Sequence, residues 1–113
     1  MLVKVNATLV DLNAATSLEG LTAELFDKDP LSVNLLAKGM VTPHGRVEFV
    51  FDITKTSDLD SPGELYPDLF VTVRDTDGNL RFRSRTIPDV RFLDSDAVTG
   101  TARTTVDLDF QRE

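Results

Sequence analysis

The chain has no cysteine and a single histidine among its 113 residues. Without cysteine, a disulfide framework, a thiolate zinc site and a cysteine nucleophile are all excluded. The absence fits a reducing compartment slightly better, and it is also compatible with secretion. Cysteine usage therefore leaves the compartment open.

Long hydrophobic runs and basic charge are also scarce. No stretch of about 18 apolar residues occurs, so we expect no membrane span. The first ten residues, MLVKVNATLV, alternate like a strand and lack the basic-then-apolar order of a signal peptide. With 19 acidic and 12 basic residues the net charge is −7, which disfavours attraction to phosphate backbones. We expect a soluble domain that binds no nucleic acid.

The residues for catalysis are missing as well. His44 stands in the turn sequence TPHG, where polar residues are common for conformational reasons. A general base needs an orienting partner and a nucleophile. No serine stands in a nucleophile motif such as G-x-S-x-G. The sequence therefore predicts no enzyme and no cofactor.

What the sequence does contain is period-two alternation of apolar and polar residues, which indicates β-strands. In VKVNATL, for example, Val3, Val5 and Ala7 share one face. Segments of this kind predict seven strands near residues 3–9, 20–27, 35–42, 46–53, 68–75, 80–86 and 103–110. The chain is long enough to bury roughly 65% of its unfolded surface without metal or disulfide support. We expect a single domain over residues 1–113.

Short alternating strands, turn signals and no amphipathic helix predict an all-β antiparallel β-sandwich, transthyretin-like or immunoglobulin-like. The Asp77-Gly78 dipeptide predicts a tight hairpin with Gly78 at positive φ. The apolar faces of the strands predict a buried core that includes Phe49, Phe51, Val71, Val73 and Leu108.

Two segments, LTAELFDKDPLSVNLLAKGMVTPHGRVEFVFD and PDLFVTVRDTDGNL, resemble the transthyretin-like and carboxypeptidase-regulatory-like sandwich modules. Such modules occur in bacterial multidomain proteins, including insecticidal toxin complexes, as structural or interaction units. The resemblance implies the same role here. It covers residues 21–80, and the acidic stretch that often follows the D-x-D pair is replaced by Val33-Asn34-Leu35-Leu36-Ala37. The family's hydroxyisourate hydrolase needs several histidines and a C-terminal Tyr-Arg-Gly-Ser, which this chain lacks.

Pairs of aspartates raise the possibility of a calcium site. If the strands run alternately up and down, one rim carries Asp27, Asp29, Asp58, Asp60, Asp94 and Asp96, and the opposite end carries His44, Asp75 and Asp77. Calcium requires six to eight oxygen ligands from converging loops. The alternative is a set of polar loops, in which Ser32 and Asn34 bond the loop around Asp29 without an ion. We favour the loop interpretation and predict no bound metal. The candidate ligands for the calcium alternative are Asp27, Asp29, Asp94 and Asp96.

Two further surface features concern partners. Arg81, Arg83 and Arg85 alternate along one strand and predict a cross-strand ladder with Asp107 and Asp109, rather than a basic stripe for an anionic partner. Apolar residues on the otherwise polar strand faces, namely Phe26, Val50 and Phe70, are candidates for one docking patch. The predicted function is thus a non-enzymatic structural or protein-interaction module, a component of a larger assembly, with a protein partner or self-association. The alternative is a calcium-dependent binding module that uses the acidic rim.

Overall fold

All of the predicted strands are present in the computed structural model, which describes residues 2–10, 12, 20–53, 67–92 and 105–113. They are β1 (Leu2–Val10), β2 (Thr22–Lys28), β3 (Val33–Met40), β4 (Arg46–Asp52), β5 (Leu69–Arg74), β6 (Leu80–Arg83) and β7 (Thr105–Gln111). No helix long and apolar enough to cross a membrane occurs in these ranges.

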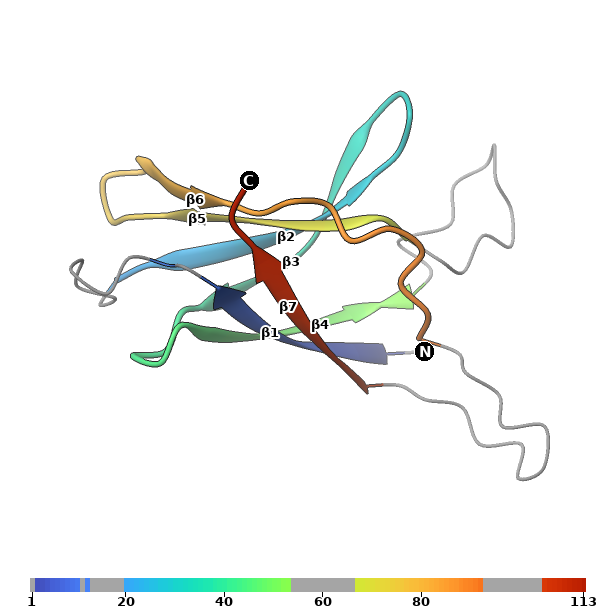
Figure 1. The fold of residues 1–113 in the computed structure, drawn as a ribbon, viewed down its shortest axis with the longest axis horizontal. Helices are drawn as coiled ribbons and strands as arrows, with labels where there is room; N and C mark the ends of the chain where they lie inside the picture. The colour runs from blue at the N-terminus through green and yellow to red at the C-terminus, as the bar shows by residue number, and fades with distance from the viewer. Residues whose placement is uncertain (1, 11, 13–19, 54–66, 93–104) are drawn as a thin grey trace.

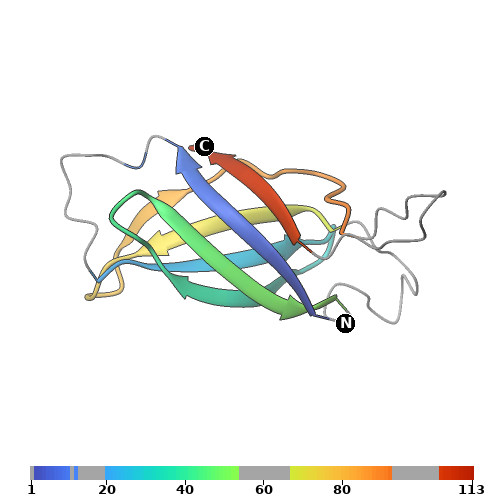
Figure 2. The ribbon, with the colours of Figure 1, turned by 90° about the horizontal axis from the view of Figure 1, so that it is seen from below.

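The strands form two layers (Figure 1), a three-stranded sheet in the order β4-β1-β7 and a four-stranded sheet in the order β3-β2-β5-β6. Figure 2 shows the strands of the three-stranded sheet crossing those of the other sheet obliquely. The predicted all-β sandwich is therefore confirmed. Neighbouring strands are antiparallel except β1 and β7, which run parallel.

The core lies between the layers, where the alternating apolar faces meet. Phe49, Val71 and Val73 are fully buried and Phe51 is 3% exposed, as predicted. The prediction for Leu108 is wrong in degree, because this side chain packs against the core but stays partly exposed on the edge strand β7. Phe92, from a segment predicted as loop, is fully buried and meets Phe51 edge to face, with ring centroids 5.6 Å apart.

On one side of the sandwich, hydrogen bonds join the two sheets. The Arg85 N–H donates to the Gln111 carbonyl at 2.8 Å, and the Glu113 N–H donates to the Arg83 carbonyl at 2.9 Å. Between them Ser84, 2% exposed, bridges to Arg112. The end of β6 and the end of β7 thus cover each other's backbone groups.

The opposite side is formed by β3 and β4, which the turn at residues 41–45 connects. In this turn the Thr42 N–H donates to the Arg46 carbonyl at 2.7 Å, and the Gly45 N–H donates to the Thr42 carbonyl at 2.9 Å. β3 and β4 belong to different sheets, and neither has a second strand neighbour among the described residues. Within the described ranges no further strand extends either sheet on this side, where Gly39 and the turn residue Thr42 lie against the outer edge of β4.

The placement of the turns follows the predicted up-and-down order. Figure 1 shows the β2–β3 hairpin at one end, and the β3–β4 and β5–β6 turns at the other. The turn prediction for Gly78 is confirmed, because this residue has φ +83° and its N–H donates to the Asp75 carbonyl at 3.0 Å. The hairpin that carries Asp27 and Asp29 is thus separated from the turns with His44 and Asp77.

Candidate functional site

The β2–β3 hairpin presents apolar side chains to solvent. It rises away from the two layers in Figure 1 and turns at Pro30 and Leu31. Leu31 is 98% exposed, Val33 52% and Leu35 43%. Val33 lies opposite Lys28, and Leu35 opposite Phe26, so their side chains share the outer face of the sheet. We call Leu31, Val33 and Leu35 the hairpin row.

An aromatic pair continues this row across the sheet. Phe26 and Phe70 are cross-strand neighbours, and their rings stack with centroids 5.1 Å apart and an interplanar angle of 17°. The Arg83 guanidinium lies 4.8 Å from the Phe70 ring centroid and pairs with the Glu113 carboxylate at 3.0 Å. Phe70 is consequently only 4% exposed although it faces outward. The accessible apolar surface is the hairpin row rather than the aromatic pair.

The expected patch of Phe26, Val50 and Phe70 does not form. Val50 belongs to β4, which lies in the three-stranded sheet, while Phe26 and Phe70 lie in the other sheet. Val50 is 48% exposed on the opposite outer face of the sandwich. Alternation within a strand could show that each residue faces outward, but it carries no information on which sheet the strand joins.

The predicted arginine–aspartate ladder is also wrong, for the same reason. β6 and β7 belong to different sheets, so their outward side chains do not stand opposite one another. Arg81 Nε instead pairs with Asp75 Oδ2 at 2.8 Å, and Arg83 pairs with Glu113. Asp107 Oδ1 accepts a hydrogen bond from Asn6 Nδ2 on β1 at 3.0 Å.

The hairpin's acidic residues bond the loop itself. Asp29 Oδ2 accepts from Asn34 Nδ2 at 3.0 Å and from Ser32 Oγ at 3.5 Å. The Asp29 N–H donates to the Ser32 carbonyl at 2.8 Å. Ser32 and Asn34 thus hold the loop in place through hydrogen bonds to the Asp29 side chain, and Ser32 also accepts one from the Asp29 backbone.

Asp27 is 2% exposed and faces the interior at the end of β2. Its Oδ1 accepts from the Asp68 N–H at 3.3 Å, and Asp68 Oδ1 accepts from the Asp89 N–H at 3.0 Å. Asp89 has a positive φ of 52°. The sequence interpretation missed the roles of Asp68 and Asp89, although both adjoin a proline, which is a turn signal.

The remaining calcium candidates, Asp94 and Asp96, and the associated Asp58 and Asp60, lie outside the described residues. Within the described ranges no three histidine, aspartate or glutamate side chains gather in a metal-binding arrangement. The calcium alternative therefore stays a prediction to be tested in solution.

At the other end, the β5–β6 turn is organised by Asp75. Its Oδ1 accepts from the Asn79 N–H and the Asp77 N–H, both at 2.9 Å. The Asn79 N–H, followed by Arg81 and the Asp77 N–H, holds the pKa of Asp75 below its ordinary value, because each stabilises the carboxylate. Asp75 is thus a turn residue, and His44 is exposed in its own turn.

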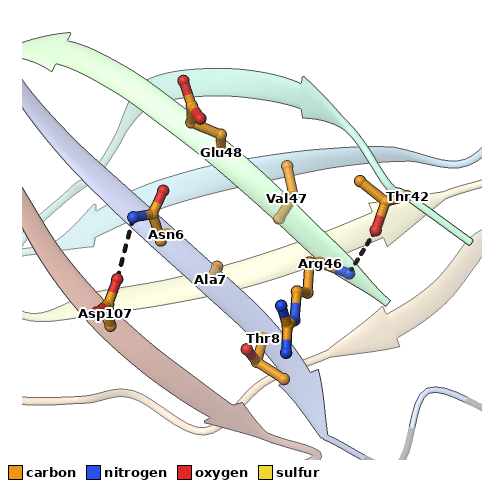
Figure 3. A pocket seen from close by; sticks show the side chains of 8 residues that line it. All are labelled: Asn6, Ala7, Thr8, Thr42, Arg46, Val47, Glu48 and Asp107. Carbon is orange, nitrogen blue, oxygen red and sulfur yellow. Dashed lines mark hydrogen bonds between the residues drawn. The ribbon is translucent and has the colours of Figure 1, made fainter. Parts of the chain in front are cut away.

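A shallow hollow lies on the outer face of the three-stranded sheet (Figure 3). It has a volume of about 490 Å³ and is lined by Asn6, Ala7, Thr8, Thr42, Arg46, Val47, Glu48 and Asp107. Figure 3 shows the Arg46 side chain beside Thr8, with the Arg46 N–H bonded to Thr42 Oγ1 at 3.2 Å. The lining combines both signs of charge and includes no aromatic ring, histidine or serine. We assign it no chemistry.

Comparison with known proteins adds information on the fold. No family model and no curated protein matches the chain. A 9R-lipoxygenase from Cyanothece PCC8801 is similar in structure, with a TM-score of 0.52 and 23% identity over 96% of this chain. The match spans only 16% of the lipoxygenase chain. An alternative pilotin from the type II secretion system of Vibrio cholerae matches 100% of this chain and 96% of its own, with a TM-score of 0.46 and 14% identity.

Proposed function

We propose that this chain is a non-enzymatic interaction or structural β-sandwich module and a component of a larger assembly. This is the role implied by the resemblance to transthyretin-like and carboxypeptidase-regulatory-like modules. The observation that supports it is the hairpin row, in which Leu31 is 98% exposed and adjoins the exposed Val33 and Leu35. Contiguous exposed apolar side chains mark interaction surfaces.

Hydrogen bonds within the hairpin also fix its conformation before any partner binds. The Asp29 N–H donates to the Ser32 carbonyl at 2.8 Å, and Asn34 Nδ2 donates to Asp29 Oδ2 at 3.0 Å. These bonds fix the turn that carries Leu31, so a partner would not have to order it on binding. Binding to a pre-ordered loop loses less conformational entropy and is correspondingly stronger.

The test is recovery and measurement of a protein partner from the native source. The protein recovered with the wild-type chain should bind Leu31→Ser at least about tenfold more weakly, because the most exposed apolar anchor is lost. Leu80→Ser is the matched control, since Leu80 is 50% exposed on the same sheet but at its other end. Equal loss in both variants, or in neither, would argue against the hairpin row as the contact surface.

Calcium-dependent binding is the second candidate function. It is favoured by the presence of two candidate carboxylates, Asp27 and Asp29, within the same hairpin as the exposed apolar row. A calcium ion bound to these carboxylates would make the conformation of the hairpin row depend on calcium. Calorimetric titration with calcium separates this candidate from the first.

A further inference from the structure

The side of the sandwich formed by β6 and β7 is closed at only one end. There the Arg85 N–H donates to the Gln111 carbonyl and joins the two sheets. Two residues later the segment after β6 bonds β5 instead, since the Ile87 N–H donates to the Leu69 carbonyl at 2.7 Å. Figure 2 shows this segment and β7 close together near the C-terminus and diverging toward the start of β7. Among the described residues, no backbone bond joins the sheets along the first half of β7.

The divergence leaves a groove between β7 and the segment after β6, which we call the β7 groove. Its volume is about 590 Å³, and it is lined by residues 87–91 on one side and 105–108 on the other. Clefts that hold ligands have volumes of about 300–1,000 Å³. Ile87, Val106 and Leu108 pack against the core and line this groove, and all three stay partly exposed. Apolar side chains that a closed sandwich would cover are thus accessible here.

The edge of β7 beside the groove offers backbone hydrogen-bonding groups. Successive residues of a strand direct their N–H and C=O groups to opposite sides in turn. The Gln111 carbonyl accepts from the Arg85 N–H, so Gln111 faces away from β1. Thr105, Asp107 and Asp109 have the same parity and face the same way. No described strand pairs with this outer edge at these three residues. An uncovered strand edge is a template for pairing with another chain.

The side chains along this edge are acidic on the outer face of the sheet and apolar on the inner face. Asp107 and Asp109 are exposed, whereas Val106 and Leu108 are partly buried. Asp107 accepts a hydrogen bond from the neutral Asn6 side chain, and no described residue forms an ion pair with either aspartate. Opposite charges on neighbouring strands stabilise a sheet, and like charges destabilise it. A strand added here would therefore gain stability from basic side chains on its outer face.

We propose that the β7 groove binds an extended segment of a partner protein in which apolar and basic residues alternate. The segment pairs antiparallel with residues 105–109, because antiparallel pairing is the more stable arrangement. Its apolar side chains enter the groove beside Val106 and Leu108. Its lysine or arginine side chains stand opposite Asp107 and Asp109. In strand addition of this kind the main-chain bonds give affinity and the alternate side chains give specificity. The β7 groove is a second contact surface, made of other residues than the hairpin row.

A second copy of this chain fits the edge less well than a basic segment does. Antiparallel pairing of β7 with β7 of the copy, centred on Asp107 or on Leu108, places aspartates opposite aspartates. Like charges directly opposite one another destabilise the pair. The chain also carries a net charge of −7, which attracts a cationic segment and repels another copy. Charge complementarity therefore selects a basic partner.

The test is fluorescence anisotropy with three labelled and capped peptides. The lysine peptide, Thr-Val-Lys-Val-Lys-Thr, has the proposed alternation, and the glutamate peptide has glutamate in place of both lysines. The reordered peptide, Val-Val-Thr-Lys-Lys-Thr, keeps the composition and charge but not the alternation. The wild-type protein should bind the lysine peptide about tenfold more tightly than either control, because only this peptide matches both faces of the edge. Equal binding of the lysine and reordered peptides, or no saturable binding, would overturn the proposal.

A charge-reversal variant tests the position of the peptide. Asp109→Lys should weaken binding of the lysine peptide about fivefold or more and strengthen binding of the glutamate peptide by a similar factor, because one cross-strand pair changes sign. Asp77→Lys is the matched control, since it makes the same charge change in the β5–β6 turn, which Figure 1 shows at the other end of the molecule from the start of β7. Circular dichroism checks the folding of both variants. An effect of Asp109→Lys no larger than that of Asp77→Lys would overturn the proposal.

Amide hydrogen exchange, followed by NMR, identifies the strand that the peptide joins. Bound lysine peptide should slow exchange at Asp107 and Asp109 more than at Val106 and Leu108, whose backbone groups already face β1. Leu31→Ser should leave peptide binding unchanged, because Leu31 belongs to the hairpin row. Slower exchange confined to other strands, loss of peptide binding in Leu31→Ser, or a dimer of the chain that excludes the peptide would overturn the proposal.

Discussion

Gly39 on β3 lies directly against Glu48 on β4. A Cβ atom at Gly39 would lie 2.9 Å from the Glu48 carbonyl oxygen and 2.6 Å from Val47 Cγ2. These two residues belong to different sheets, so the contact brings the layers together at one end of the side formed by β3 and β4. Only glycine allows this approach without displacement of backbone.

Gly39→Ala should destabilise the protein by about 1–3 kcal/mol, because the added methyl group meets backbone that cannot rotate aside. The measurement is denaturant unfolding monitored by circular dichroism. A second effect should appear in hydrogen exchange, with faster exchange at Val41, whose N–H donates to the Leu21 carbonyl near this contact. An unchanged unfolding midpoint would show that β3 and β4 are further apart than described.

Gly78→Val should also be destabilising, but through the backbone alone. Gly78 has φ +83° and no atom lies within 4 Å of its Cβ position, so the cost is conformational strain of about 1–3 kcal/mol. Gly78→Asn is the control, since asparagine tolerates positive φ better than a β-branched residue does. Equal unfolding midpoints for the two variants would contradict the turn conformation.

Phe49→Ala should remove about 3–5 kcal/mol of stability, because a fully buried ring leaves a cavity between the sheets. Val50→Ala is the matched control on the next residue, which faces outward and should change the free energy of unfolding by less than about 0.5 kcal/mol. Thermal melts at low protein concentration compare the two. A Phe49→Ala melt that matches wild type would disprove the inward orientation of this face of β4.

Asp75 should make stability depend on acidic pH. Its folded-state pKa is lowered from 3.8, chiefly by the Asn79 N–H, so its stabilising effect is complete above that value. The effect is lost as the pH falls through the lowered pKa, where the folded carboxylate becomes protonated.

Asp75→Asn should therefore lose less stability than wild type between neutral pH and pH values below 3.8. Asp77→Asn, in the same turn, is the control, because the carboxylate of Asp77 bonds no described residue. Unfolding midpoints across this pH range give the comparison. Identical pH profiles for wild type and Asp75→Asn would show that the turn bonds contribute nothing to folding.

Calcium and chelator should leave the melting temperature unchanged. Asp29 is engaged by Asn34 and Ser32, and Asp27 by the Asp68 N–H, so the hairpin is held without an ion. A bound ion would stabilise the folded state by about 2.7 kcal/mol at a hundredfold excess over its dissociation constant. For a domain of this size that corresponds to a rise of several degrees. A rise of this kind, reversed by chelator, would favour calcium-dependent binding over the calcium-free loop.

The sequence by itself determined the strands and the direction in which their side chains face. Alternation places Phe49 and Val71 inward and Val50 and Phe70 outward, because successive side chains on a strand point to opposite faces. The turn at Gly78 was equally predictable, since positive φ strongly favours glycine. These features depend on neighbours along the chain. The structure confirms them through the burial of Phe49 and Val71, the exposure of Val50, the stacking of Phe70 on Phe26 and the positive φ of Gly78.

The tertiary structure alone decided which strands share a sheet. The candidate patch of Phe26, Val50 and Phe70 assumed neighbours that the sheets do not provide. The same holds for the predicted ladder between the arginines of β6 and the aspartates of β7. Strand pairing depends on packing between segments distant in the sequence, such as β1 with β7, and period-two alternation is the same whichever sheet a strand joins. The burial of Phe92 has the same origin, because an irregular segment has no periodicity to reveal its inward residue.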